Sequence, residues 1–413
     1  MQKNTVIKNV SFYDSTEKEF KHNYNILIKN SKIDKISKHK LDINGGYQLI
    51  DGSDKYLIPG LINMHSHPQR RHLGRICSSG PFRFGAAGIE DLPDTFRMAY
   101  AIKNCWRETI NEGVTTIRAA GSKNFLNIEL RDIFRQKIIT GPRIISTGPI
   151  ISTTGGHVTI GINGAMEADG IEGVQKTVRQ VLKHEADWIK LCVTGGLSGI
   201  HKGEHPSMVQ FTFEEVAAAV DEAHRKLKKV MVHCMASDAA RMAIKAGIDC
   251  LEHGNLLSEE IISMMKENNV SFVPTMSGIY KVYQREFDAG NTELADKIKE
   301  VVFPQKQVVS KAIKAGILIG AGTDTLGNMI DEIKMLADCG MTNAEALNAA
   351  GVNAAKILDI EAIIGSIEES KNADLVLLSA DPLADLNNLS KIEKVILSGE
   401  FFDSEHDKLF EGI

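Results

Sequence analysis

The stretch Leu61-Ile-Asn-Met-His-Ser-His67 joins a short apolar run to a His-x-His pair. Apolar runs of this length between polar segments are typical of buried β-strands. Side chains two residues apart on a strand point to the same side, so His65 and His67 can face one point in space. The pair fits two imidazole ligands of a metal ion, and it also fits an ordinary structural or surface pair.

Similar runs recur beyond this stretch, separated by segments with helical periodicity. This alternation predicts strand-helix units around a parallel sheet. Eight such units would form an α/β fold with a (β/α)8 TIM barrel, in which reactive side chains lie at the C-terminal ends of the strands. The eight predicted strands are residues 61–64, 114–118, 143–147, 188–192, 230–234, 249–252, 271–274 and 317–321.

Boundary signals mark the helices between these strands. Thr212 is followed three residues later by Glu215, which predicts a capping box at the start of a helix. Ser237 precedes a second helical run, and Gly247 suits the left-handed conformation at the end of that run.

The two flanks of the predicted barrel have a different texture. Residues 1–58 and 365–413 hold short alternating runs between polar turns, which predicts antiparallel β structure. We expect both ends to form one small β-sandwich domain beside a barrel of residues 59–364. The predicted strands of the flanks are residues 5–12, 24–28, 31–36, 47–50, 373–378 and 392–397.

Other predicted strands also end in residues that can bind metals. Lys190, His233, His253 and Asp324 stand at four further strand ends, and Glu252 precedes His253. Each has an ordinary alternative explanation: a solvent-facing lysine, a core histidine with satisfied hydrogen bonds, or a helix N-cap. Their joint occurrence at the strand ends of one barrel favours a metal centre.

Composition excludes several other classes of protein. Hydrophobic residues make up 43% and charged residues 24% of the 413 residues, as in ordinary globular proteins. The net charge of -5 lacks the basic excess that nucleic acid binding requires. The sequence contains no membrane-spanning apolar run, no signal-peptide core near its start and no CxxC pair among its six cysteines. We expect a soluble cytoplasmic protein without a nucleic acid or membrane partner.

Taken together, the motifs resemble the amidohydrolase superfamily, and within it the imidazolonepropionase-related and Xaa-Pro dipeptidase-like branch. The resemblance covers nearly the whole chain. It rests on Pro59-Gly-Leu-Ile-Asn-Met-His-Ser-His67, Lys190, His233, Glu252-His-Gly254, Gly322-Thr-Asp324 and Asn372-Ala-Asp-Leu-Val376. Features of the branch are Thr194-Gly-Gly196, Gln210-Phe-Thr212 and Pro274-Thr275.

The resemblance implies a binuclear metal centre with a carboxylated lysine. An ammonium group has no lone pair for a cation, so CO2 would first convert Lys190 into an anionic carbamate. Imidazole and carboxylate ligands favour two Zn²⁺ ions per chain, and manganese, iron or cobalt would also fit. The implied ligands are His65, His67 and Asp324 for one ion, His233 and His253 for the other, and Lys190 as the bridge.

The same resemblance implies hydrolysis. Two dications about 3.5–4 Å apart lower the pKa of a shared water, which gives a bridging hydroxide at neutral pH. Asp324 would be the general base that passes the proton of this water to the departing amine. His157 is similar to a substrate-contacting histidine of the branch and would stabilise the tetrahedral intermediate. It fits equally well a turn histidine fixed by local hydrogen bonds.

The predicted substrate is a small amide that carries a carboxylate, such as a dipeptide or an N-acyl amino acid. Arg70 and Arg71, in a long Gly-rich segment, could bind that carboxylate or lie on a solvated loop face. His201 and His205 are expected at the surface. Met235 replaces a tyrosine of some dipeptidase-like relatives, which leaves the exact substrate open.

Three alternative functions stay open. A cyclic amide hydrolase resembling imidazolonepropionase is one, although that pattern is usually mononuclear and Lys190 argues against it. A deaminase of this superfamily tends to carry a glutamate where this chain has Ala236. A non-catalytic binding barrel would generally have lost several ligands. The sequence is also compatible with a homo-oligomer.

Overall fold

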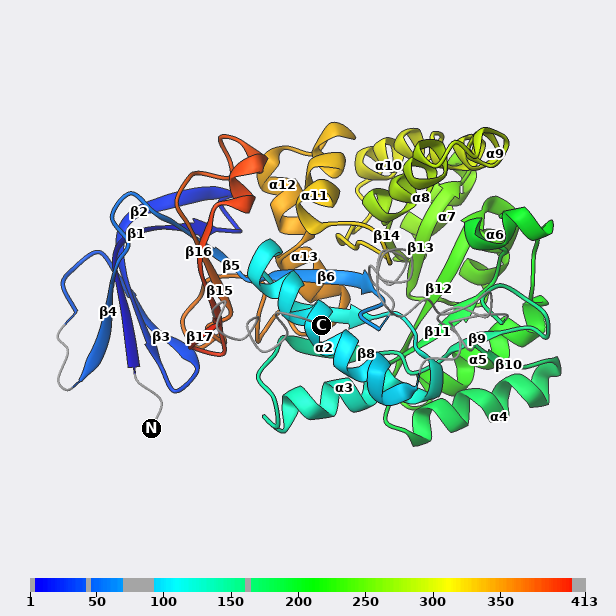
Figure 1. Ribbon diagram of the computed structural model, residues 1–413, viewed down its shortest axis with the longest axis horizontal. Coiled ribbons are helices and arrows are strands. Elements are labelled where there is room, and N and C mark those ends of the chain that lie inside the picture. Colours follow the sequence, from blue (N-terminus) through cyan, green and yellow to red (C-terminus); the bar gives the residue numbers. More distant parts are fainter. Residues whose placement is uncertain (1–3, 42–45, 70–92, 160–164, 403–413) are drawn as a thin grey trace.

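The computed structural model describes residues 4–41, 46–69, 93–159 and 165–402. Figure 1 shows a β-rich part beside a larger part in which helices lie around a group of strands. The larger part carries every residue that the sequence predicts for the metal centre.

Both ends of the chain contribute strands to one mixed sheet, which forms the β-rich part (Figure 1). Its strand order is β17-β16-β15-β5-β1-β2-β3, and β4 also pairs with β1. Alternating isoleucine, valine and leucine side chains from both ends enclose one apolar core. The strands are β1 (Asn4–Asp14), β2 (Glu19–Lys29), β3 (Lys32–Ser37), β4 (Tyr47–Asp51), β5 (Tyr56–Pro59), β15 (Leu375–Leu378), β16 (Ile392–Leu397) and β17 (Glu400–Phe402).

Two features of this sheet differ from the predictions. β1 pairs in parallel with β4 and β5, whereas the sequence pattern predicts antiparallel pairs. Side chains alternate in the same way along both kinds of pair, so the pattern does not report strand direction. In addition, hydrogen bonds connect all eight strands into one sheet, while a sandwich would contain two. β1 makes this connection because its first half pairs with β4 and its second half with β5.

Two parallel sheets form the centre of the larger part. One contains β6 (Leu61–Ser66), β7 (Val114–Ala119) and β8 (Arg143–Ser146). The other has the order β10-β9-β11-β12-β13-β14 and contains β9 (Ile150–Ser152), β10 (Met166–Glu167), β11 (Trp188–Cys192), β12 (Lys229–Ala236), β13 (Cys250–Leu256) and β14 (Ser271–Val273). Seven of the eight predicted strands are therefore confirmed as strands.

The eighth predicted strand, residues 317–321, is held by single bridges in place of a regular ladder. Phe272 of β14 donates to Leu318 O at 3.0 Å and accepts from Gly320 N at 2.9 Å. On its other side, the segment accepts a bond from Met64 N of β6 at Ala321 O, at 2.8 Å. β8 is the other edge strand of the three-stranded sheet. There, Ser146 O accepts a hydrogen bond from Asp187 N at 2.7 Å, and Asp187 directly precedes β11.

Helices lie along the outside of these strands (Figure 1). The capping box at Thr212 and Glu215 is present, and Gly247 has the expected positive φ of 92°. Ser237 does not cap its helix, because its hydroxyl donates to Leu256 O. The helices are α2 (Asp94–Glu112), α3 (Leu126–Arg135), α4 (Gly170–Lys183), α5 (Phe213–His224), α6 (Ser237–Lys245), α7 (Glu259–Glu267), α8 (Met276–Asp288), α9 (Thr292–Val302), α10 (Gln305–Lys314), α11 (Met329–Asp338), α12 (Asn343–Ala349) and α13 (Val352–Ile357), with short 3-10 turns η2 (Lys123–Phe125), η3 (Leu197–Lys202) and η4 (Leu386–Ser390).

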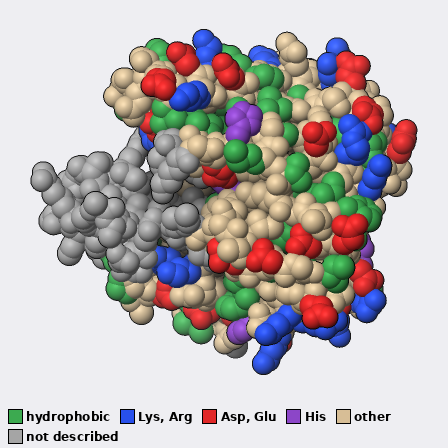
Figure 2. Space-filling view, turned by 90° about the vertical axis from the view of Figure 1, so that its right-hand side faces the viewer, with side chains coloured by type: hydrophobic (Ala, Val, Ile, Leu, Met, Phe, Trp, Pro, Cys, Tyr) green, Lys and Arg blue, Asp and Glu red, His purple; other side chains and the backbone are tan. Residues whose placement is uncertain are grey.

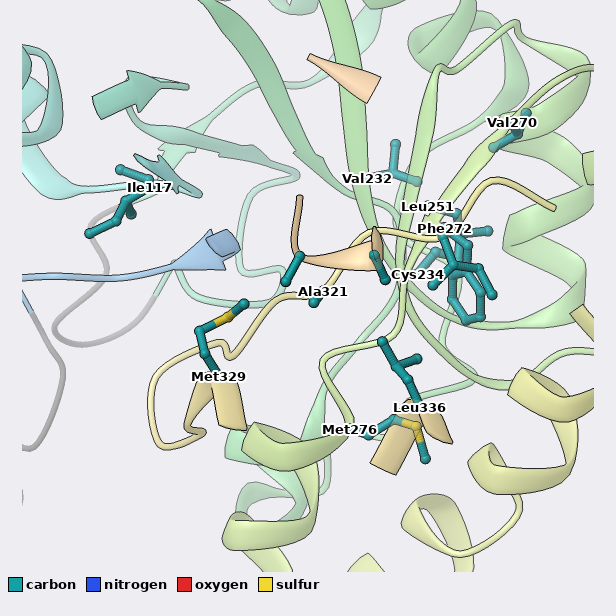
Figure 3. Close-up of a cluster of buried hydrophobic side chains, with 14 of the residues drawn as sticks. Ile117, Val232, Cys234, Leu251, Val270, Phe272, Met276, Ala321, Met329 and Leu336 are labelled. Atoms are coloured by element: carbon teal, nitrogen blue, oxygen red, sulfur yellow. The ribbon is translucent and has the colours of Figure 1, made fainter. Parts of the chain in front are cut away.

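The main hydrophobic core fills the space between the strands and the helices. Figure 3 shows Val232, Leu251 and Phe272 from three adjacent strands, with Met276 of α8 and Leu336 of α11 in the same cluster. Burying this apolar surface is the principal term that holds strands and helices together.

The described residues also bear on membrane association, disulfide bonding and surface charge. No helix among them is long and apolar enough to cross a membrane. The five described cysteines are all free and buried, as expected without a disulfide framework. On the face shown in Figure 2, basic and acidic side chains are interspersed outside the grey atoms.

One tyrosine connects the mixed sheet to the helices of the larger part through hydrogen bonds. The hydroxyl of Tyr13, on β1, donates to Ala344 O and Asn348 Oδ1 of α12, each at 3.0 Å. The side chain is buried, and burial raises the pKa of this hydroxyl. Asn348 in turn donates to Ser15 O at 3.0 Å, so the contact is reciprocal.

We therefore expect Tyr13→Phe to lower the free energy of unfolding by about 1–2 kcal/mol, because it leaves buried acceptors on α12 without their donor. Urea denaturation would measure this loss. Tyr24→Phe, at a half-buried position of the same sheet, is the matched control. Equal stability of the Tyr13 variant and the wild type would show that this hydrogen bond contributes nothing.

Candidate metal centre

The His-x-His pair lies at the C-terminal end of β6, with both side chains buried. The Nε2 atoms of His65 and His67 are 3.3 Å apart. Asp324 reaches the same point from a distant part of the chain: its N–H donates to His65 O at 2.7 Å, and its Oδ1 lies 3.5 Å from His67 Nε2. One potential ligand atom from each of the three residues lies within 4.8 Å of the others, so the group can hold a metal ion.

His233 and His253 lie outside that group of three, but their rings adjoin it. The ring centroid of His253 is 5.0 Å from that of His65, and the centroid of His233 is 4.5 Å from that of His253. They stand on the neighbouring strands β12 and β13. The imidazoles from three strands therefore form one continuous row.

Lys190 of β11 is buried in the interior, with 2% of its surface exposed. Its Nζ has no hydrogen-bond partner among the described residues. Burial lowers the pKa of this amine, while the negative charge of Glu252 opposes the shift. The positive charge of Lys190 in turn helps burial to lower the pKa values of nearby His65 and His253. This amine has lost its usual solvation and has gained no hydrogen bond from the described residues in return.

Each of the four histidines has one ring nitrogen bonded to an acceptor outside the centre. Burial lowers the pKa values of His65, His233 and His253 well below 6.5, so these rings are neutral, and a neutral ring carries one N–H. The outer bond occupies that N–H and leaves the other nitrogen as a possible ligand. The bonds are His65 Nδ1 to Glu252 Oε2 at 2.7 Å, His67 Nδ1 to Gly121 O at 3.2 Å, His253 Nδ1 to Thr275 Oγ1 at 2.7 Å, and His233 Nε2 to Gly195 O at 3.1 Å.

Arg118 and Glu252 form a buried ion pair beneath the centre that the sequence analysis missed. Glu252 Oε1 accepts from Arg118 Nη2 at 2.8 Å, while Oε2 binds His65. The guanidinium also donates to Met64 O at 2.6 Å and lies 4.8 Å from the ring centroid of Trp188. The available signal was a charged residue, Arg118, at the end of a run of β-branched residues predicted as a buried strand.

His157 lies beside this row of rings. Its ring stacks on that of His233 with a centroid distance of 4.5 Å, and its Nδ1 bonds to Glu204 Oε1 at 2.7 Å. Glu204 was not among the predicted site residues. His205 is exposed, as expected. Arg70 and Arg71 lie outside the described residues, and so does the side chain of His201.

Comparison with known proteins identifies the family. A model of the amidohydrolase family matches residues 56–402. The chain belongs to this family. Among curated relatives, ochratoxinase of Aspergillus niger is 30% identical over 310 residues, which cover 69% of this chain but only 63% of that protein. The chain thus spans less than two thirds of that relative's length.

Solved structures agree with this assignment. A Xaa-Pro dipeptidase with methionine bound in its active site is 29% identical and has a TM-score of 0.83. A prolidase complexed with N-methylphosphonate-L-proline is 25% identical and has a TM-score of 0.84. Each match covers 96% of this chain and 99% of the other. The superfamily predicted from the motifs is thereby confirmed, together with an α/β fold of the amidohydrolase kind.

The backbone of this amidohydrolase is left-handed at three positions of the centre. His253, Thr275 and Asp324 have φ values of 72°, 53° and 54°. Such a conformation costs a non-glycine residue about 1–3 kcal/mol and persists where its surroundings hold it. The buried side chain of Gln305 holds the backbone at two of these strand ends. Its Nε2 donates to His253 O at 2.7 Å and to Pro274 O at 2.6 Å.

Glu332 of α11 holds the chain directly after Thr275. Its carboxylate accepts from Met276 N at 3.1 Å and from Ser277 N at 2.7 Å, at the N-terminus of α8. The side chain is fully buried, and this burial raises its pKa to about 7 although the backbone bonds oppose the shift. The helix that follows β14 is therefore fixed by a carboxyl group that titrates near neutral pH.

For the ion pair, we expect Glu252→Gln to weaken both stability and metal binding. The change leaves the Arg118 charge buried without a counter-charge, which costs on the order of 3–5 kcal/mol of unfolding free energy. It also loosens His65, so zinc affinity should fall about 10- to 100-fold. Denaturation of the metal-free protein and chelator competition would measure the two effects.

Glu222→Gln is the matched control, because it breaks an ion pair with an Arg179 that is exposed at the surface. Its effect on stability should be much smaller, and zinc affinity should not change. Unchanged zinc affinity of the Glu252 variant would contradict a role for this carboxylate in the centre.

For Glu332, we expect a specific pH dependence. Because its pKa in the folded protein, about 7, lies above the 4.5 of an unfolded glutamate, its stabilising contribution is complete below 4.5 and is lost as the pH rises through about 7. The difference corresponds to at most about 3 kcal/mol. Glu332→Gln mimics the protonated form, so its free energy of unfolding should fall less than that of the wild type between pH 5 and pH 8. Parallel urea titrations would test this, and identical slopes would refute it.

Proposed function

We propose that this chain is a metal-dependent hydrolase that cleaves the amide bond of a small substrate with a free carboxylate, a dipeptide or an N-acyl amino acid. The observation that carries the proposal is the meeting of His65, His67 and Asp324, with ligand atoms within 4.8 Å, in a chain that also buries Lys190 without a hydrogen-bond partner among the described residues.

The donor set fits a binuclear centre. His65, His67 and Asp324 would hold one ion, and His233 and His253 the other. Lys190 supports this assignment, because a buried amine with a lowered pKa keeps a lone pair that can attack CO2. The N–C bond forms, the amine loses a proton, and the resulting carbamate offers two oxygens to the site. Zinc suits imidazole and carboxylate donors, and other divalent metals would also fit.

Side chains of this protein would carry out proton transfer and charge stabilisation. When bound, the metal pair would lower the pKa of a water molecule and polarise the amide carbonyl. Asp324 accepts the proton of the attacking water and returns it to the nitrogen of the departing amine. His157 donates to the substrate oxygen as negative charge develops there, which stabilises the transition state more than the bound substrate.

The substrate class is inferred from relatives of similar shape. One of them is a Xaa-Pro dipeptidase bound to methionine, and another is a prolidase bound to a phosphonate of proline. Both ligands contain an amino acid, so we infer an amino acid with a free carboxylate on one side of the scissile bond. One of Arg70 and Arg71 is proposed to bind this carboxylate, because arginine binds carboxylates through two parallel hydrogen bonds.

We also propose that residues 59–364 form one closed (β/α)8 barrel, with residues 1–58 and 365–413 as a second domain. Support comes from the bonds of residues 317–321 to β14 and β6 and from the bond between Asp187 and Ser146. In such a barrel, ligands at the C-terminal strand ends share one mouth.

Metal analysis together with a substrate screen would test the function. Zinc-loaded protein should contain about two metals per chain and hydrolyse members of a dipeptide and N-acyl amino acid library. Lys190→Met keeps the side-chain length but cannot form a carbamate, so it should hold at most one metal. Bicarbonate should reactivate CO2-depleted wild type but not this variant. Asp324→Asn should lower kcat by about 10²- to 10⁴-fold.

Lys226→Met, at an exposed position, is the control for the lysine substitution. No bound metal after zinc supplementation would favour a non-catalytic binding barrel. Two bound metals without hydrolysis of any library member would refute the proposed substrate class.

A further inference from the structure

We propose that Glu204 is a positioning residue for His157, and that this pair orients the donor to the substrate oxygen. The inference rests on the proposed hydrolysis, in which His157 is that donor. Glu204 binds Nδ1 of the ring, so Nε2 is the nitrogen that remains for the substrate. A carboxylate behind an imidazole also stabilises the ring while Nε2 carries a proton and donates it.

The contact is short and shielded from solvent. Glu204 Oε1 lies 2.7 Å from His157 Nδ1, and the side chains are 22% and 8% exposed. The same oxygen accepts from Gly196 N at 2.8 Å. Two donors on one carboxylate oxygen fix its position, and this oxygen in turn fixes the rotation of the imidazole.

Two glycines of the loop after β11 make room for the pair. A Cβ on Gly196 would overlap the ring of His157, and a Cβ on Gly199 would overlap the carboxyl group of Glu204. Any other residue at these two positions would displace one partner of the hydrogen bond. The Gly-rich loop that follows Lys190 is therefore shaped around His157 and Glu204.

The pair is also placed against the candidate metal centre. The ring of His157 stacks on His233 at a centroid distance of 4.5 Å and an interplanar angle of 29°. His233 is bonded to the same loop through Gly195 O. The loop thus holds a proposed ligand with one residue and the proposed donor with another, which sets their relative position.

The alternative hypothesis is that Glu204 only stabilises its own loop, by accepting the hydrogen bond from Gly196 N. The two hypotheses predict different dependence of the Glu204 effect on His157. If Glu204 acts through His157, removing its carboxylate should have no effect once the imidazole is gone. If it only holds the loop, its loss should weaken the site whether or not His157 is present.

A double-mutant cycle with Glu204→Ala and His157→Ala tests this dependence. We expect Glu204→Ala to lower kcat by about 10- to 100-fold with a smaller change in KM, and to have no further effect in the His157→Ala background. Metal content should stay at the wild-type value in all variants. Glu204→Gln keeps an acceptor oxygen for Nδ1 but loses the negative charge, so its kcat should lie between those of the wild type and Glu204→Ala. Additive effects in the cycle would overturn the proposal.

Glu167→Ala is the matched control, because its exposed carboxylate accepts from Gly155 N near His157 without a hydrogen bond to the ring. It should leave kcat within about twofold of the wild type. Gly196→Ala, which pushes on the ring and leaves both residues of the pair unchanged, should reproduce the loss of kcat.

An NMR measurement that does not require catalysis distinguishes this proposal from the proposed function. In zinc-loaded protein with ¹⁵N-labelled histidine, the resonances of His157, assigned from His157→Ala, should report a proton on Nδ1. In Glu204→Ala the hydrogen-bond shift of the Nδ1 resonance should be lost, and in Glu204→Gln it should remain. Wild-type protein that shows these signals but hydrolyses nothing would refute the function alone. A His157 spectrum that is identical in the wild type and in Glu204→Ala would overturn the role of Glu204.

Discussion

The candidate metal centre depends on keeping several imidazoles buried, neutral and correctly turned at the same time. Burial is the largest cause of the lowered pKa values of His65, His233 and His253, and it favours the neutral form of these rings. A neutral ring still has two tautomers, and only the outer hydrogen bond selects between them. The acceptors come from β13, from the loops after β7 and β11, and from the residue before α8. The geometry of the centre is therefore set by how separate strand ends meet, and no single segment contains it.

This arrangement links metal binding to the stability of the core. Glu252 orients His65, but a carboxylate in the interior requires a counter-charge, which Arg118 provides from β7. The guanidinium lies against Trp188, so the ion pair is part of the packed interior. A change that breaks it affects folding and ligation together. The left-handed residues at the strand ends also link the centre to the core. Their conformational cost is offset only while contacts such as those of Gln305 are in place.

The sequence predicts the strands of the larger part well because their apolar runs are buried on both faces. It also predicts the meeting of His65, His67 and Asp324, since reactive groups of parallel strands gather at their C-terminal ends. The supporting contacts could not be predicted. The bond between His65 and Glu252 joins residues 187 positions apart, and the partner of a buried charge is chosen by tertiary packing. The direction of β4 and β5 was missed for a related reason, because side-chain alternation is the same in parallel and antiparallel pairs.

An apolar cluster extends to the strand end that carries His233. Met235, two residues after His233, is fully buried in this cluster with Leu197 and Ile279. A thioether enclosed in that way offers no donor to a substrate. Leu197 begins the turn η3 of the loop that carries Glu204, so the cluster that contains Met235 also supports this loop. Position 235 therefore supplies no donor, and the proposed mechanism assigns the hydrogen bond to a substrate oxygen to His157. Its partner Glu204 lies on the loop that this apolar cluster supports.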